Sequence, residues 1–374
     1  MDGIYNKPLY EEALEAALRK IRSNLHVFSH NYPHVSVNNV YIPEENRLWT
    51  SSFFPGIAYL AYDITGEKEY LAYSDEYLKS FQWRLEKGHT ETHDLGFLYT
   101  LSCVSNYKLT GNEKAKVIAL KAADILIGRF NEKGRYIQAW SKIGLKYPDV
   151  KMIIDTMLNL PLLYWAFETT GDQKYYKAAY NHAVTTALHI VREDASTYHT
   201  YLMNPDTGEA VEGKTHQGFA DESTWARGQA WAVYGFVLSY VYTKEPDFLH
   251  VAKKTCNYFI NHLPDDFIPY WDFSFDDDKP DIRDSSAAAI ALCGLLELKK
   301  HVQGEERELY EKVAYKMVES LYINYSTRNN ANSNGLIMHG MYHRTDGADE
   351  CTIWGDYFYL EGLVRLLKDW RIYW

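Results

Sequence analysis

A turn sequence that recurs between long helical stretches constrains the fold of this chain more than any other feature. Thr65-Gly66-Glu67, Thr110-Gly111-Asn112 and Thr170-Gly171-Asp172 each separate two stretches whose apolar residues recur at helical spacing. Glycine suits the left-handed position that ends a helix, and the Glu, Asn or Asp after it can cap or electrostatically favour the next helix. The pattern predicts helical hairpins, with weaker copies of the turn at 243–248 and near Gly304.

The spacing of these turns indicates how many hairpins the chain holds. The copies that begin at Thr65, Thr110, Thr170 and Thr243 are about 45 to 73 residues apart, which is too long and irregular for a short-period solenoid. Six hairpins of roughly 60 residues each would fill the 374 residues. No internal linker is evident, so we expect a single domain over residues 1–374.

Two kinds of helical segment occur along the chain. Residues 10–28, 114–130 and 249–263 are amphipathic, whereas 155–169 and 225–242 are apolar on nearly all sides. A helix that is apolar all round is buried, so we expect an inner ring of helices wrapped by an outer ring. Strands are expected only as short pieces, at 35–41, 198–202 and 267–275.

Composition and charge exclude several classes of function. The formal net charge is −11 and no basic cluster interrupts the acidity, which disfavours nucleic-acid binding. No apolar stretch is long enough to cross a bilayer, and Met1–Tyr5 does not resemble the start of a signal peptide. The four cysteines are widely spaced, as expected of buried, reduced thiols. We therefore expect a cytoplasmic protein that binds neither nucleic acid nor membrane.

Polar clusters stand at the starts of the apolar stretches, at about one per hairpin. They are His93-Asp94, Asp155, Arg227, Arg283–Ser286 and, late in the chain, Trp354–Tyr357. In a ring of helical hairpins, the starts of the inner helices gather at one mouth. We therefore expect the chemistry of the protein at that mouth.

Asp155 and Asp94 are the candidates for acid–base chemistry. Asp155 lies among apolar residues at 152–161, where burial disfavours the ionised form, so we expect its pKa to rise as a general acid requires. Asp94 follows His93 beside another apolar stretch. Each could instead be a helix cap or a hydrogen-bonded core carboxyl. Together they favour action on a glycoside, for which paired carboxylates are the usual equipment.

The stretch 215–231 combines side chains that suit an acidic sugar. Gln217 offers a donor and an acceptor for hydroxyls, and Trp231 offers a flat face for a sugar ring. Arg227 offers a planar fork of donors for a carboxylate and needs a buried anionic partner, from either the protein or a ligand. Lys214 could also neutralise a carboxylate, although a surface salt bridge is the simpler interpretation.

Histidines and further tryptophans extend this set. His199 and His216 are candidate ligand donors, with a structural role as the alternative, and Trp49 and Trp140 are candidate sugar platforms, with core packing as the alternative. No two histidines stand at helical i, i+4 spacing with a glutamate partner, and no cysteine joins them. We therefore expect no metal and no cofactor.

Nine short motifs, in chain order, together resemble the unsaturated glucuronyl hydrolases of glycoside hydrolase family 88. They are His93–Phe97, Gln138–Trp140, Ile154–Pro161, Tyr198–Thr200, Thr215–Gly218, Ser223–Trp231, Tyr270–Phe273, Arg283–Ala287 and Ile353–Tyr357. The resemblance runs from about Trp49 to the C-terminus. It implies an all-α fold, an (α/α)6 barrel, in agreement with the hairpin pattern.

The resemblance also implies a reaction and its substrate. Polysaccharide lyases leave a C4=C5 double bond in the terminal uronate of glycosaminoglycan-type disaccharides, and the family hydrates this vinyl ether. By that likeness, Asp155 protonates C4 and then activates the water that adds at C5. The resulting hemiketal opens and releases the neighbouring sugar.

Roles for the other candidates follow from the same resemblance. Asp94 would orient the uronate hydroxyls and influence the developing charge. The remaining residues would bind the substrate: His93, His199 and Gln217 in the uronate subsite, Arg227 and Trp231 holding it, and Trp49 and Trp140 as the stacking surface.

One stretch departs from the relatives that prefer sulfated disaccharides. Those relatives carry a cluster with Ser and Lys shortly before the Trp-Gly-Asp-Tyr motif, where this chain has Met341–Gly347. Here Asp346 would repel a sulfate, and Arg344 is the cation that could still bind one. We therefore expect an unsulfated substrate, or weak discrimination against sulfate.

Two alternatives stay open. The first is an unsaturated rhamnogalacturonyl hydrolase on the same barrel, against which the 216–231 block argues. The second is a non-catalytic protein that binds acidic glycans, against which the presence of both Asp94 and Asp155 argues.

Overall fold

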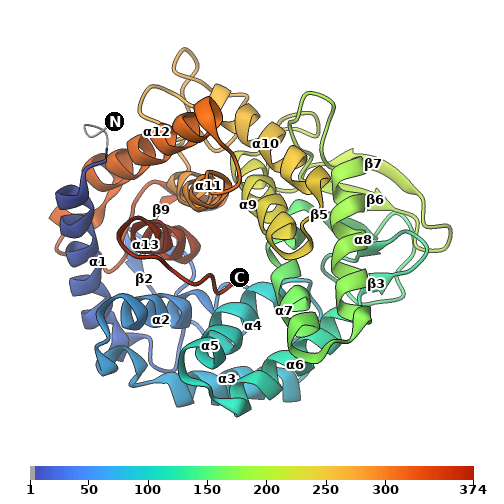
Figure 1. The fold of residues 1–374 in the computed structure, drawn as a ribbon, viewed down its shortest axis with the longest axis horizontal. Coiled ribbons are helices and arrows are strands. Elements are labelled where there is room, and N and C mark those ends of the chain that lie inside the picture. The colour runs from blue at the N-terminus through green and yellow to red at the C-terminus, as the bar shows by residue number, and fades with distance from the viewer. Residues whose placement is uncertain (1–4) are drawn as a thin grey trace.

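The computed structural model describes residues 5–374, and its helices form two concentric rings (Figure 1). The outer ring is made of α1 (Lys7–Val27), α3 (Ser74–Glu86), α6 (Glu113–Ile127), α8 (Gln173–His189), α10 (Pro246–Asn261) and α12 (Gly304–Ser320). The inner ring is made of α2 (Phe53–Thr65), α4 and α5 (Leu95–Tyr99 and Ser105–Thr110, continuous through a π-helical turn), α7 (Leu160–Thr170), α9 (Ala226–Thr243), α11 (Ser285–Leu298) and α13 (Ile353–Leu367). Outer and inner helices alternate along residues 5–374, so the (α/α)6 barrel predicted from the sequence is confirmed.

Burial separates the two rings as the apolar patterns predict. Every residue of α11 is buried, as are residues 226–239 of α9 and 353–364 of α13. The outer helices bury one face only; α1, for example, buries Tyr10, Ala13, Ala17 and Ile21 against the inner ring. Apolar contact between the rings is therefore the main stabilising interaction of the barrel.

The predicted start of the third inner helix is wrong by five residues. Asp155 lies in a 3₁₀ turn, Ile154–Leu158, and α7 begins at Leu160, with Pro161 in its first turn. Proline lacks an N–H and is tolerated only in the first turn of a helix, so the helix begins at this point. Asp155 consequently stands before the helix, in the 3₁₀ turn, facing the mouth of the barrel.

The recurrent turns have the predicted backbone geometry. Gly66, Gly111 and Gly171 all adopt the left-handed conformation, with φ of 75°, 70° and 74°. The side chains of Asn112 and Asp172 then cap α6 and α8 by accepting a hydrogen bond from a backbone N–H. Glu67 makes no such cap and pairs with an arginine of α1 instead.

Short antiparallel strands fill the connections between helices. They are β1 (Ser36–Val37) with β2 (Val40–Tyr41), β3 (Phe130–Asn131) with β4 (Tyr136–Ile137), the three-stranded sheet of β5 (Lys151–Ile153), β6 (Thr200–Met203) and β7 (Ala210–Lys214), and β8 (Gly340–His343) with β9 (Asp346–Glu350). The strand expected at 198–202 is confirmed as β6, whereas residues 35–41 form a hairpin of two short strands, β1 and β2, instead of a single strand. Residues 267–275 form only isolated bridges, Trp225 with Asp272 and Tyr270 with Arg283. The β8–β9 hairpin was not predicted.

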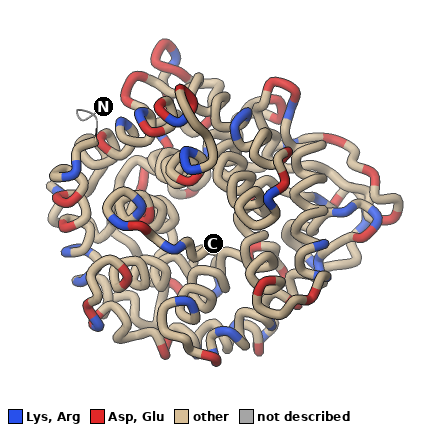
Figure 2. The backbone as a smooth tube through the Cα atoms, in the orientation of Figure 1, with Lys and Arg blue, Asp and Glu red and all other residues tan. Residues whose placement is uncertain are grey.

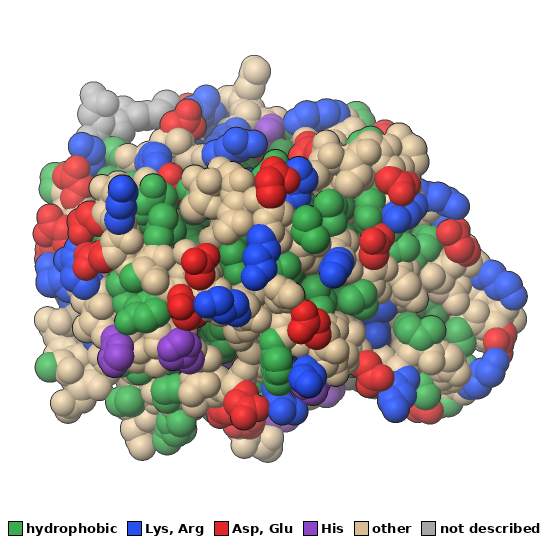
Figure 3. All heavy atoms as spheres, turned by 90° about the horizontal axis from the view of Figure 1, so that it is seen from below, with side chains coloured by type: hydrophobic (Ala, Val, Ile, Leu, Met, Phe, Trp, Pro, Cys, Tyr) green, Lys and Arg blue, Asp and Glu red, His purple; other side chains and the backbone are tan. Residues whose placement is uncertain are grey.

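Charged residues lie mainly on the outer helices and the loops (Figure 2). On the face shown in Figure 3, acidic and basic side chains are interspersed among apolar ones. The helices described at residues 5–374 include none that is both long and apolar enough to span a membrane. All four cysteines are buried and unpaired, as predicted.

Candidate active site

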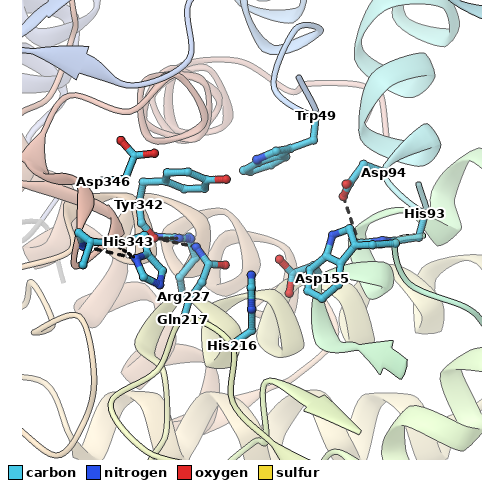
Figure 4. Close-up of a pocket in the computed structure, with 12 residues that line it drawn as sticks. Trp49, His93, Asp94, Asp155, His216, Gln217, Arg227, Tyr342, His343 and Asp346 are labelled. Carbon is cyan, nitrogen blue, oxygen red and sulfur yellow. Dashed lines mark hydrogen bonds and ion pairs between the residues drawn. The ribbon is translucent and has the colours of Figure 1, made fainter. Parts of the chain in front are cut away.

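One cavity at a mouth of the barrel collects polar residues that precede or begin the inner helices. Its volume is about 360 Å³. Asp94, Asp155 and Arg227 stand at or just before the starts of α4, α7 and α9, and all three line it. The complete lining is Trp49, His93, Asp94, Trp140, Asp155, His216, Gln217, Arg227, Tyr342, His343, Thr345 and Asp346 (Figure 4). The predicted convergence at one mouth is therefore confirmed for these three clusters.

Asp94 is held by its immediate neighbours. It occupies the N-cap position of α4, but its side chain makes no capping hydrogen bond. One carboxylate oxygen lies 3.2 Å from Nε2 of His93, and the other accepts a hydrogen bond from the Thr92 hydroxyl at 2.6 Å. Because the helix does not use this carboxylate as a cap, the carboxylate is directed into the cavity (Figure 4).

His199 faces Asp155 with a defined ring nitrogen. Its Nε2 lies 3.6 Å from Oδ2 of Asp155. Its Nδ1 accepts hydrogen bonds from the main-chain N–H groups of His216 and Gln217, at 3.3 and 3.0 Å. A nitrogen that accepts from N–H groups carries no proton, so the neutral ring holds its proton on Nε2, toward Asp155. The ring also packs on Trp225, with centroids 4.1 Å apart.

The electrostatic setting of Asp155 differs from the prediction. Burial raises the pKa of Asp155, but His199, His93 and Arg227 together outweigh burial and hold the pKa below its usual range. The predicted rise is therefore wrong for the ligand-free protein. Apolar neighbours in the sequence do not reveal the histidines and arginine that other segments bring to the carboxylate.

Three histidines, two on the cavity and one behind it, are neutral near neutral pH. Burial lowers the pKa of His93, of His199 and of His216. They therefore act as hydrogen-bonding groups rather than as cations, and the charge balance of the cavity is set by carboxylates and Arg227.

The guanidinium of Arg227 is held by an ion pair and by main-chain carbonyl groups within the protein. Its Nη1 lies 2.8 Å from Oδ2 of Asp284 and also donates to the carbonyl of Met341, while Nη2 donates to the carbonyl of Tyr342 at 3.0 Å. The guanidinium packs on Trp225 and Trp354, with 4.4 and 5.2 Å to the ring centroids. The anionic partner that a buried arginine needs is thus Asp284, a fully buried residue.

The β8–β9 hairpin supplies one wall of the cavity. Tyr342, His343, Thr345 and Asp346 all line it; only Asp346 was predicted to face the substrate, as a charge that would repel sulfate, and none was predicted to bind it. The departure of Met341–Gly347 from the sulfate-preferring pattern was the sequence signal for this wall. His34 packs behind it, 4.8 Å from the Tyr342 ring, and burial lowers the pKa of His34 to about 4.

Three predicted binding residues do not line the cavity. Trp231 is fully buried between Phe97 and Phe358, so it packs in the core and offers no face to a sugar. Arg344 pairs with Asp281 at 3.0 Å, at the surface and outside the lining. His199 acts behind Asp155 instead of on the cavity surface. Lys214 makes surface salt bridges with Glu212 and Asp221.

The cavity is acidic overall. It presents the carboxylates of Asp94, Asp155 and Asp346, whereas the charge of Arg227 is balanced by Asp284. Across residues 5–374, no group of three or more His, Cys, Asp or Glu side chains is arranged to hold a metal ion. The groups present can hydrogen-bond hydroxyls, stack on a sugar ring and transfer protons.

Comparison with known proteins gives a consistent result. Residues 21–362 match the model of Glycosyl Hydrolase Family 88. An unsaturated chondroitin disaccharide hydrolase from Streptococcus agalactiae is 42% identical over 370 residues, which are 97% of this chain and 93% of the relative. The crystal structure of an unsaturated glucuronyl hydrolase from Streptococcus agalactiae superimposes with a TM-score of 0.95 at 41% identity, covering 99% of this chain and 94% of the other.

A second organism gives the same similarity. The unsaturated glucuronyl hydrolase of Bacillus sp. GL1, described as responsible for the degradation of glycosaminoglycan, has a TM-score of 0.92 at 40% identity, with 96% of each chain covered. A variant of the Streptococcus agalactiae enzyme, with a TM-score of 0.88 at 38% identity over 99% of this chain and 94% of the other, is complexed with dGlcA-GalNAc6S.

Proposed function

The chain belongs to glycosyl hydrolase family 88, and on that premise we propose that it releases the unsaturated uronic acid from the non-reducing end of lyase-generated disaccharides. The observation that carries the proposal is the placement of Asp94 and Asp155 on one cavity, which Trp49 and Trp140 also line. Two carboxylates beside aromatic faces suit the binding and protonation of a sugar. The family relatives that act on unsaturated disaccharides support the same substrate class.

The reaction begins with a proton transfer to carbon. Asp155, in its acid form, protonates C4 of the vinyl ether, and positive charge develops at C5 and on the ring oxygen. The carboxylates of Asp94 and Asp155 stabilise that charge. Asp94 also accepts hydrogen bonds from the uronate hydroxyls, because its own helix leaves the carboxylate uncapped.

Addition of water completes the reaction. Asp155, now a carboxylate, accepts a proton from the water that adds at C5, and a hemiketal forms. The hemiketal opens by breaking the bond between C5 and the ring oxygen, and the hemiacetal left at C1 expels the neighbouring sugar as an alcohol. One water is consumed, and Asp155 ends protonated, as it began.

The substrate itself helps to protonate Asp155. The uronate carboxylate adds a negative charge to a cavity that already presents Asp94 and Asp346, and it displaces water. Both effects raise the pKa of a neighbouring carboxyl. The complex therefore recovers the acid form of Asp155, although the ligand-free protein holds this carboxyl ionised.

The substrate is held mainly by neutral groups. Gln217 and Tyr342 lie on the cavity opposite the carboxylate pair (Figure 4), and His93 and Trp140 lie beside that pair. Arg227 uses three of its five N–H donors on the protein, so two can still face the uronate carboxylate. We assign Arg227 to both roles, orientation of the hairpin and attraction of the anion.

The hairpin wall favours an unsulfated neighbouring sugar. Asp346 is the charged side chain of this wall that lines the cavity, and Arg344 is turned to Asp281. A sulfate beside Asp346 meets a like charge without a free cation. We propose that the enzyme prefers unsulfated disaccharides, or discriminates only weakly among them.

We also propose that residues 1–374 act as one catalytic domain in the cytoplasm. Four buried, unpaired cysteines suit a reducing compartment. Fractionation of cells that express the protein at natural levels tests the compartment.

The absorbance of the C4=C5 bond tests the activity. Purified protein is incubated with unsaturated disaccharides from chondroitin, hyaluronan and heparin, and with a pectin-derived unsaturated disaccharide. Loss of absorbance on the glycosaminoglycan set, in the order unsulfated before sulfated, is the expected result. Turnover of the pectin-derived substrate alone would overturn the substrate class, and binding without any loss of absorbance would overturn the catalytic role.

A further inference from the structure

A buried carboxylate outside the cavity holds the loop that carries two cavity residues. The 215–223 loop connects β7 to α9 and places His216 and Gln217 on the cavity. Asp272 is fully buried and does not line the cavity. One of its oxygens accepts hydrogen bonds from the Phe219 N–H at 2.9 Å and the Ser223 hydroxyl at 2.7 Å. The other accepts from the Ser274 N–H at 3.0 Å.

These three hydrogen-bond donors offset the free-energy cost of removing the Asp272 carboxylate from water. Among residues 5–374, no lysine, arginine or histidine pairs with Asp272. A buried carboxylate without a cation is stable only while its hydrogen-bond donors stay in place. Two of the three donors belong to the 215–223 loop, so the loop and Asp272 hold each other.

The far side of the same loop holds His199. The main-chain N–H groups of His216 and Gln217 both point at Nδ1 of His199. That contact keeps the proton of His199 on Nε2, which faces Asp155 at 3.6 Å. The contacts thus run from Asp272 through the loop to His199 and then to Asp155.

We propose that Asp272 is a positioning residue which, by holding the 215–223 loop, fixes the tautomer of His199 and directs its Nε2–H at Asp155. The inference rests on the proposed function for its link to catalysis, whereas the tautomer itself is a property of the protein without substrate. The main chain of Asp272 also forms a bridge with Trp225, and a change of side chain alone leaves that bridge intact.

Gly218 provides an independent probe of the same contact. A Cβ atom at Gly218 would lie 2.6 Å from the Thr215 hydroxyl and 3.2 Å from the Asp272 carboxylate. To accept a methyl group at this position, the Thr215 hydroxyl must shift, and the loop and the Asp272 carboxylate must separate slightly. Gly218→Ala should therefore weaken the contact between the loop and Asp272 without replacing Asp272 itself.

Other titratable and charged groups near Asp155 and His199 also influence the pH dependence of turnover. His93 and Arg227 face Asp155, and Arg227, Lys151 and His216 surround His199. Asp272→Asn leaves all of these side chains in place. A change in the pH profile of this variant therefore reports on the orientation of His199.

The first test reads the tautomer directly. Long-range proton–nitrogen spectra of protein labelled with ¹⁵N-histidine distinguish protonated from unprotonated ring nitrogens, and a His199→Gln variant assigns the signals. The expected result is a single Nε2–H tautomer in the unmodified protein and a mixture of tautomers in Asp272→Asn. An unchanged Nε2–H tautomer in a folded Asp272→Asn variant would overturn the proposal.

The second test follows the pH dependence of turnover. The Nε2–H of His199 lowers the pKa of Asp155, whereas burial raises it. If that N–H turns away in Asp272→Asn, the pKa of Asp155 rises, and the midpoint at which kcat/KM falls with rising pH should increase by roughly one unit. Adding Asp272→Asn to His199→Gln should move the midpoint no further. Equal and additive shifts would show that Asp272 does not act through His199.

Asp266→Asn is the control for both tests, and two further variants replace Asp272→Asn if that variant does not fold. Asp266 accepts one main-chain N–H and one hydroxyl, from Ile268 and Tyr325, lies 3.5 Å from Arg283 and makes no contact with the loop. Asp266→Asn should leave the tautomer and the midpoint unchanged. If Asp272→Asn fails to fold, Ser223→Ala and Gly218→Ala carry both measurements, and wild-type behaviour of both would overturn the proposal.

The two readouts also separate this inference from the proposed function. The tautomer is measured without substrate. A tautomer that changes in a protein that turns over no unsaturated disaccharide contradicts the proposed function and leaves the positioning role in place.

Discussion

The two walls of the cavity are built differently. One wall carries Asp94 and Asp155 at the starts of inner helices, and the other carries Tyr342 and Asp346 on the β8–β9 hairpin (Figure 4). The helical wall is part of the packed inner ring, whereas the main chain of the hairpin accepts hydrogen bonds from Arg227 of α9 and from Gln217 of the 215–223 loop. The groups that transfer protons thus lie on the helical wall, and the groups that contact the neighbouring sugar lie on the hairpin wall.

The largest effect should follow from a change on the helical wall. Asp155→Asn removes the proton donor while preserving its shape, so kcat should fall by roughly a thousandfold or more. Binding of the unsaturated disaccharide, measured by titration calorimetry, should persist. The same change at the surface residue Asp194, which only holds Ser196, is the control and should leave kcat unchanged. Turnover that survives in Asp155→Asn would contradict the assigned role.

The next effect should follow from release of the hairpin. Asp284→Asn leaves the guanidinium of Arg227 buried without its counterion, which should cost about 3 kcal/mol of unfolding free energy in denaturant titrations. KM should rise more than kcat falls, because the hairpin wall loosens while Asp155 stays in place.

The paired control is Asp281→Asn. It breaks a comparable arginine–aspartate contact with Arg344, but that arginine is half-exposed, so the loss should stay below about 1 kcal/mol. Equal losses in the two variants would show that the buried pair does not anchor the hairpin.

The pH dependence of the rate should report on the helical wall alone. Catalysis needs the acid form of Asp155, and the bound uronate raises the pKa of this carboxyl, so kcat should be highest at mildly acidic pH and should fall about tenfold per unit above its midpoint. The ratio kcat/KM reports the free protein, in which the pKa of Asp155 lies below its usual range, so kcat/KM should fall with rising pH from a more acidic midpoint. A rate that rises with pH above neutrality would rule out Asp155 as the acid.

The smallest effect should follow from a change of charge on the hairpin wall. Asp346→Asn removes a like charge that faces a sulfated sugar, so the ratio of kcat/KM for sulfated over unsulfated disaccharides should rise about fivefold. Asp349→Asn, on the same hairpin but paired with His339 at the surface, should leave the ratio unchanged. An unchanged ratio in Asp346→Asn would place the neighbouring sugar elsewhere.

The helical wall could be predicted from the sequence because its signals are local. Thr-Gly turns define the hairpins, apolar runs define the inner ring, and a carboxylate at the start of such a run is visible without a structure. Seven of the ten predicted site residues line the cavity, and all but Gln217 belong to the helical wall or its neighbours: Trp49, His93, Asp94, Trp140, Asp155, Gln217 and Arg227.

What the sequence did not reveal depends on contacts between distant segments. Trp231 lies one turn beyond Arg227 in α9, and only the packing of the rings decides that the tryptophan faces the core. The lowered pKa of Asp155 depends on histidines from two other segments. The hairpin wall follows from pairing of β8 with β9, for which short polar strands give little periodic signal.

The chemistry that sets this enzyme apart from other glycosidases is hydration of a double bond in place of displacement at the anomeric carbon. It is tested most directly by following, in one early time course, the C4=C5 absorbance and the release of the neighbouring sugar from an unsulfated unsaturated disaccharide. The absorbance should fall no later than the sugar appears, with one double bond lost for each sugar released. Sugar released while the absorbance persists would contradict it.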